Sequence, residues 1–216
     1  MPQVGSAQEV VLTISGGLAD AETGGVVVNV IPREGANTFS GQFNYSGSND
    51  SLQGSNYTDR LKAKGLRSPA ELISVYDVNP MFGGRIVADK LWFYSGFRQT
   101  GAKNTVPGMF WNKNAGDPTK WIVDFDRSQP AFTTRVERQA TLRVTWQATP
   151  RNKFNMLWAE QYLDSNYGKG GGAETAGQLT TPEATPRSYY IPSRQPHVTW
   201  SSPISGRLLA EAGWGM

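Results

Sequence analysis

The chain has 216 residues, of which 38% are hydrophobic and 18% are charged, and its formal net charge is +3. This balance excludes a disordered chain, and the absence of any apolar run near about 20 residues excludes a helical membrane protein. The small charge gives no reason to expect a nucleic-acid partner, and the absence of cysteine excludes disulfides and thiolate metal sites. With 24 glycines, 13 prolines and seven tryptophans, the composition favours an all-β fold.

The first part of the chain predicts two short strands. Residues 9–14 form the first of them, and residues 26–31 form a β-branched run typical of a strand covered on both faces. Pro32 and Gly35 end this second strand, because proline cannot donate to a ladder and glycine permits a turn.

A strict alternation begins at Phe39. Phe43 and Tyr45 share its face, while the other face carries uncharged polar residues. A strand of this kind fits a wall between lipid and water. We therefore expect a small packed unit over residues 1–35 and the wall of a barrel over residues 36–216.

The passage between these two parts contains a recognisable set of residues: Gly24, Gly25, Asn29, Gly35, Asn37, Phe39 and Gly41. This set resembles the plug-to-barrel junction of TonB-dependent outer-membrane receptors. Residues 59–66 and 76–94 resemble the Oar-like branch of that family, whose members often carry a carboxypeptidase-regulatory-like domain ahead of the plug. Beyond residue 94 the similarity is a matter of pattern alone.

The resemblance implies the C-terminal strands of a plug domain followed by the first seven strands of a transmembrane antiparallel β-barrel in the outer membrane of a Gram-negative bacterium. It implies active uptake of a scarce extracellular ligand of unknown identity. It also implies contact with outer-membrane lipid and with a TonB-type energy-coupling complex. The segment that binds this complex precedes the plug, and no signal peptide opens the chain, so we expect the sequence to be a fragment.

Further along the chain, six more alternating segments predict strands that pair antiparallel in sequence order. They cover residues 75–87, 91–100, 139–148, 154–161, a segment ending at 200, and 208–214. Long connections over residues 48–74, 101–135 and 164–195 alternate with short turns over residues 88–90, 149–152 and 203–206. Outer-membrane barrels show this alternation of long extracellular loops and short periplasmic turns. Ser68 and Pro69 also predict a short helix near residues 68–71.

Each predicted strand has an apolar and a polar face. Val144 lies on an apolar face, so we expect Val144→Arg to interfere with membrane insertion, whereas Thr145→Arg, on the polar face, is expected to be tolerated. The charged residues of the polar faces are expected to line the lumen or to contact the plug, together with the single histidine: Arg85, Arg143, His197, Arg207 and Glu211.

Four aromatic residues within the second long connection are candidates for ligand contact: Phe110, Trp111, Trp121 and Phe125. Such rings can bind sugars or peptides, and they can equally pack the loop against itself. Asp117, Asp124 and Asp126 could bind a hard cation, but no EF-hand pattern surrounds them. We predict no metal, no cofactor and no enzymatic activity.

Two functions of other classes stay open. One is a soluble β-sandwich that binds carbohydrate through the tryptophan-bearing loops, and the other is a secreted glycosidase that uses two loop carboxylates. Large apolar residues on a face without a protein partner favour the barrel, and the sequence supplies them: Leu142, Val144, Trp146, Met156 and Trp158.

Overall fold

The computed structural model describes residues 7–13, 26–66, 69–166, 181–184 and 188–216. These residues form two antiparallel sheets with very little helix, which confirms the predicted all-β class. In this part of the chain, no helix is both long and apolar enough to cross a membrane.

The smaller sheet consists of β1 (Ala7–Thr13) and β2 (Val27–Pro32), which pair with Val10 opposite Val30. Both predicted strands are confirmed, apart from residue 14, which lies outside the described residues. The expectation that β2 is covered on both faces is wrong, because Val28 is 51% exposed among the described residues. A sheet of two strands offers too little partner surface to bury both faces.

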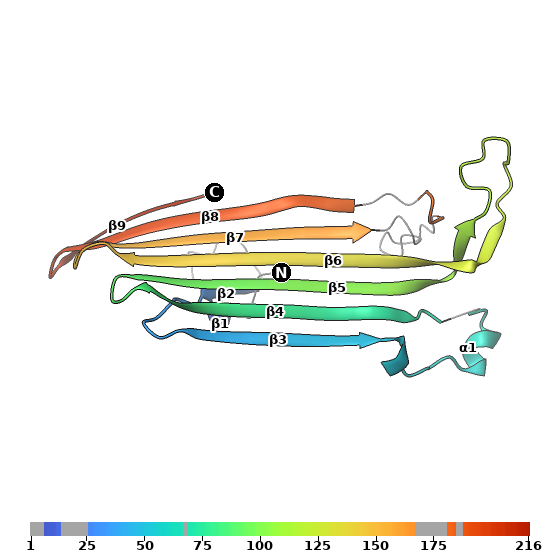
Figure 1. Ribbon diagram of the computed structural model, residues 1–216, viewed down its shortest axis with the longest axis horizontal. Coiled ribbons are helices and arrows are strands. Elements are labelled where there is room, and N and C mark those ends of the chain that lie inside the picture. The colour runs from blue at the N-terminus through green and yellow to red at the C-terminus, as the bar shows by residue number, and fades with distance from the viewer. Residues whose placement is uncertain (1–6, 14–25, 67–68, 167–180, 185–187) are drawn as a thin grey trace.

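The larger sheet has seven strands in sequence order, and each neighbouring pair is antiparallel, as predicted. The strands are β3 (Ser40–Asn49), β4 (Leu72–Val87), β5 (Leu91–Asn112), β6 (Phe125–Gln147), β7 (Lys153–Asn166), β8 (Ser188–Ser205) and β9 (Leu208–Gly215). The short turns after β4, β6 and β8 lie at one end of the sheet, and the longer connections leave from the opposite end (Figure 1). Among the described strands, β3 and β9 each have a single neighbour.

The second connection is much shorter than the sequence predicts. β5 and β6 continue as a paired ribbon, so that only residues 113–124 join them. The ribbon accommodates the expected strand breakers through a register shift between Thr105 and Phe110, with Gly108 at φ 71°, and Pro130 lies opposite Phe110. Pairing between the two strands therefore overrides the local breaker signals.

The predicted helix position is also wrong. Among the described residues, the helical turns of the first connection are the 3₁₀ helix η2 (Asp50–Leu52) and α1 (Asp59–Ala63). Residues 69–71 are not helical, and Ser68 lies outside the described residues. The Glu71 backbone N–H donates to Thr105 Oγ1, and the Thr105 N–H donates to the Glu71 carbonyl. These bonds hold the segment beside β5 instead of within a helix.

The third connection and the last turn differ as well. β8 begins at Ser188, inside the predicted loop, where Ser188 pairs with Ser165. It continues to Ser205, so the turn into β9 is limited to residues 206–207.

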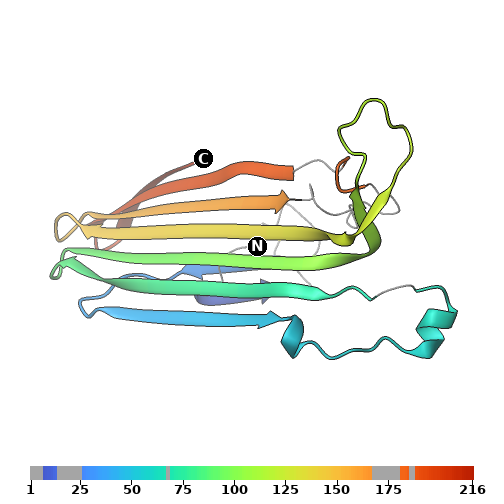
Figure 2. The ribbon, with the colours of Figure 1, turned by 45° about the vertical axis from the view of Figure 1, so that its right-hand side comes forward.

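Alternation gives the larger sheet two distinct faces. The register places Arg143 beside Tyr94 on β5 and Leu157 on β7. We name this the inner face because it contacts the end of β2 at Pro32, and the smaller sheet lies on this side (Figure 2). The opposite or outer face carries Leu142 and its cross-strand neighbour Trp158.

The polarity of the buried and exposed faces is the reverse of that in a water-soluble sheet. The inner face is rich in polar groups and contains buried side chains: Asn79, Met81, Tyr94, Gln139 and Thr145. The outer face carries exposed large apolar side chains: Phe43, Phe82, Phe97, Leu142, Trp146, Met156, Trp158 and Trp214. An extensive exposed apolar face marks a surface that interacts with another protein or with a membrane.

Candidate functional site

An arginine fixes the segment between the two sheets to the inner face. Arg143 Nη1 donates to the Pro32 carbonyl at 2.6 Å, and Nη2 pairs with the Glu34 carboxylate. Lys153 Nζ lies 3.6 Å from the same carboxylate. Because the Arg143 side chain is only 17% exposed, these charge-assisted bonds are less screened than those on an open surface.

Replacing this arginine is expected to weaken the fold. Arg143→Met should lower the free energy of unfolding by about 1.5–3 kcal/mol, because the Pro32 carbonyl loses the charged donor and Glu34 loses the nearer of its two cationic partners among the described residues. Arg85→Met is the control, since Arg85 is exposed and has no ion pair among the described residues, and we expect a change below about 0.5 kcal/mol. Denaturant titration followed by circular dichroism measures both, and equal losses would contradict a fixing role for Arg143.

Two residues of the predicted junction hold this segment close to β5. Asn37 Oδ1 accepts hydrogen bonds from Trp92 Nε1 at 2.8 Å and from the Asp89 backbone N–H at 3.0 Å. Asp89 has φ 58°, so Asn37 supports the left-handed conformation of the short turn. A Cβ at Gly35 would lie 2.4 Å from the Phe93 carbonyl oxygen, which explains why only glycine fits here.

The other junction residues lie at the start of the large sheet or within the small one. The Phe39 ring stacks on Phe82, with centroids 5.7 Å apart. A Cβ at Gly41 would meet the Met81 carbonyl at 2.9 Å, and Asn29 lies in β2. The two remaining motif residues lie outside the described residues: Gly24 and Gly25.

The predicted lumen residues are only partly brought together. By the strand register, four of them lie on the inner face: Arg85, Arg143, His197 and Glu211. His197 and Arg143 line one pocket of about 280 Å³ together with Pro32, whereas Arg85 and Glu211 lie on the distant strands β4 and β9. Arg207 lies in the turn before β9 and not on a strand face.

The four candidate aromatic residues do not form one site. Phe110, Trp111 and Phe125 lie in the paired ribbon, not in a loop, and Trp111 pairs with Asp126. Trp121 is in the connecting loop, which projects beyond the sheet, and it is 93% exposed (Figure 1). Among the described residues, Trp121 is therefore left exposed and lies apart from the paired rings.

The three acidic residues nearby have separate partners. Asp117 accepts hydrogen bonds from the hydroxyl and backbone N–H of Thr119, which lower the pKa of Asp117. Asp124 pairs with Lys113, and Asp126 accepts from Ser128. Within the described part of the chain, no group of three or more acidic or histidine residues is placed to hold a metal ion.

The outer face carries a polar network that the sequence analysis did not identify. Gln99 Nε2 donates to the Tyr76 hydroxyl at 3.0 Å, and Gln99 Oε1 accepts from Arg138 Nε at 3.1 Å. The guanidinium carbon of Arg138 lies 5.9 Å from the Tyr162 ring centroid. These residues follow the apolar stretch of each strand towards the long connections. The alternation of side chains along each strand was the signal that could have placed them on the outer face.

Comparison with protein-family models, with curated proteins and with solved structures gives no match to this chain. Its function must therefore be inferred from the geometry of the two faces and of the junction.

Proposed function

We propose that this chain belongs to a TonB-dependent outer-membrane receptor, in which β3–β9 form part of the barrel wall and β1–β2 form part of the plug. The observation that carries the proposal is the exposed apolar outer face set against a polar-rich inner face. In a transmembrane barrel the outer residues contact lipid and the inner residues contact the plug or the lumen.

The dimensions of the apolar stretch support the same proposal. At the short-turn end, an aromatic row crosses the outer face, and the rings of Trp146 and Phe154 lie 5.5 Å apart. Towards the other end, Tyr162 lies on the same face of β7, eight residues beyond Phe154. Eight residues span about 27 Å along a strand, or about 20 Å across a membrane when the strand is tilted. Aromatic girdles about 25 Å apart are typical of such barrels.

The sorting of the connections is a second support. Short turns gather at one end of the sheet and longer connections at the other, as expected when only one end faces the exterior (Figure 1). The junction residues 33–37, through Gly35 and Asn37, resemble those of the receptor family. On this basis the role we propose is uptake of an extracellular ligand, with energy supplied by an inner-membrane partner.

Tryptophan quenching by lipid tests the membrane location. In a variant that retains Trp158 alone, with the other tryptophans changed to phenylalanine, phosphatidylcholine brominated along its acyl chains should quench most of the fluorescence. The matched variant retains Trp92, which lies on the inner face beside Asn37, and its quenching should be weak. Circular dichroism checks that both variants keep their strands.

The alternatives give a different result. A soluble carbohydrate-binding protein would fold in buffer without lipid, and the emission of Trp158 would be unchanged by brominated vesicles. Such a result, with sugar-dependent quenching of Trp121, would replace the membrane proposal.

A further inference from the structure

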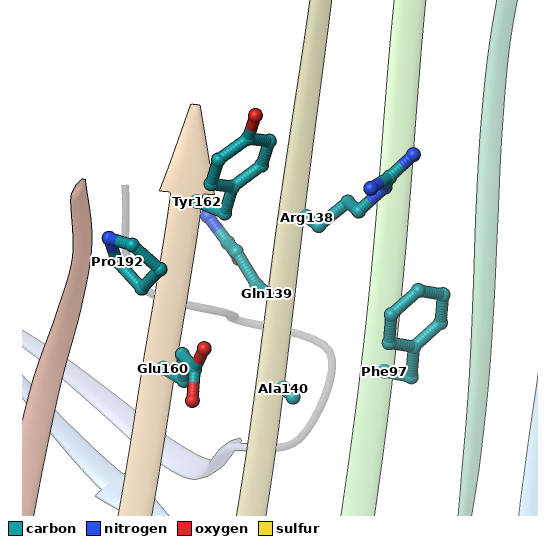
Figure 3. Close-up of a pocket in the computed structure, with 7 residues that line it drawn as sticks. All are labelled: Phe97, Arg138, Gln139, Ala140, Glu160, Tyr162 and Pro192. Atoms are coloured by element: carbon teal, nitrogen blue, oxygen red, sulfur yellow. The ribbon is translucent and has the colours of Figure 1, made fainter. Parts of the chain in front are cut away.

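The outer face contains a hollow at the boundary between its apolar stretch and its polar network. Its volume is about 290 Å³. Figure 3 shows the residues that line it, among them Phe97, Arg138, Ala140, Glu160, Tyr162 and Pro192. Phe97, Ala140 and Pro192 supply apolar surface that continues into the exposed apolar stretch below.

Arg138 lies at the rim of the hollow, where its side chain is held in place through Nε and its terminal nitrogens remain for another acceptor. The Arg138 side chain extends over β5 (Figure 3). There its Nε donates to Gln99 Oε1, and Gln99 Nε2 donates to the Tyr76 hydroxyl. The guanidinium also lies near the Tyr162 ring. Among the described residues, the two terminal nitrogens of Arg138 have no hydrogen-bond partner. A guanidinium held in this way suits a bidentate contact with phosphate.

The other charges at the rim cancel. Arg194 Nε lies 3.4 Å from Glu160 Oε2, so this carboxylate already has a cationic partner. Of the two charged residues that line the hollow, Arg138 is therefore the one without an ion pair in the described part of the chain, and it lies beside an apolar floor. This arrangement is complementary to a molecule that has one acidic group and an adjoining hydrocarbon chain.

We propose that the hollow binds a single anionic lipid of the surrounding membrane. The phosphate contacts the terminal nitrogens of Arg138, and one acyl chain lies over Phe97 and Ala140. This site rests on the proposed membrane location, because a lipid reaches the outer face only if that face is embedded.

Lipids with brominated chains test the site and the membrane location separately. The reporter is again Trp158, which lies two residues before Glu160 on the same face of β7. At equal low mole fraction in phosphatidylcholine vesicles, brominated phosphatidic acid should quench Trp158 more than brominated phosphatidylcholine does. The excess should correspond to about fivefold enrichment of the acidic lipid near the reporter.

Three variants define the site. Arg138→Gln should remove the excess, and Ala140→Phe should remove it by filling the hollow without changing any charge. Arg151→Gln removes the same charge from a short turn at the other end of the sheet, where Arg151 is exposed, and should leave the excess intact. Equal loss in Arg138→Gln and Arg151→Gln would mean general attraction of acidic lipid and would overturn the site.

The remaining outcomes are also decisive. Quenching of Trp158 by brominated phosphatidylcholine, with no excess for phosphatidic acid, overturns the lipid site and leaves the membrane location intact. Loss of the excess on addition of inorganic phosphate at millimolar concentration would assign the hollow to free phosphate. Absence of quenching by either lipid overturns both proposals.

Discussion

Leu142→Arg is expected to prevent stable insertion of the sheet into a bilayer. Leu142 lies near the middle of the apolar stretch of β6, it is 43% exposed, and its cross-strand neighbours are Ser95 and Trp158. An arginine facing lipid at this depth costs about 2–4 kcal/mol. Denaturant titration of the chain in phosphatidylcholine vesicles, followed by tryptophan emission, measures the loss.

The control for this substitution places the same charge on the inner face. Gln42 lies on the inner face at the same level along the strands as Leu142. The register places it in one cross-strand row with Met81 and Thr141, and Thr141 directly precedes Leu142. It is exposed, so Gln42→Arg should change stability by less than about 0.5 kcal/mol. If the two variants unfold at the same denaturant concentration, the faces are assigned wrongly.

Thr145 cannot serve as this control, although its position in the alternation of β6 predicts that it faces away from Leu142. Its side chain does point to the inner face, but the residue is only 3% exposed. Thr145 Oγ1 also donates to Asn155 Oδ1 at 3.2 Å. We therefore expect Thr145→Arg to destabilise the sheet through overpacking and burial of a charge, contrary to the expectation from alternation alone.

Gly35→Ala is expected to release the junction segment from the inner face. The new Cβ would lie within 3 Å of three backbone atoms of Phe93, and backbone in the interior of a sheet cannot shift cheaply. The cost is about 3 kcal/mol, at the upper end of typical overpacking. Such a cost raises the population of the state in which the segment is released from the sheet about a hundredfold. Because Arg33 lies in this segment, directly after β2, trypsin should cleave after Arg33 faster by the same factor.

Gly54→Ala is the matched substitution for this test. Gly54 lies in the first connection, and a Cβ there would have no atom within 4 Å. The cleavage rate after Arg33 should stay at the value of the unmodified chain. Unchanged cleavage in Gly35→Ala as well would indicate that the contact between Gly35 and β5 does not hold the segment.

The sequence by itself determines the class, the strand order and the two faces. Side chains alternate with a period of two, so Leu142, Val144 and Trp146 necessarily share a face, and Arg143 lies on the other. Short turns such as residues 88–90 leave consecutive strands no choice but antiparallel pairing. Gly35 and Asn37 of the junction can also be recognised in the sequence, although their contacts cannot be predicted from it.

Only the tertiary structure decides how far the strands extend, what is buried and which charges meet. The breakers around Gly108 predict a loop, but cross-strand pairing continues the ribbon because two long strands satisfy each other's backbone groups. Arg143 meets Glu34 across more than a hundred positions of sequence, a distance over which no local pattern carries information. The same holds for Arg138, because neighbouring strands set its bond to Gln99 and its place above the hollow. Parity assigns a side chain to a face, but burial and partners depend on which strands pack beside it.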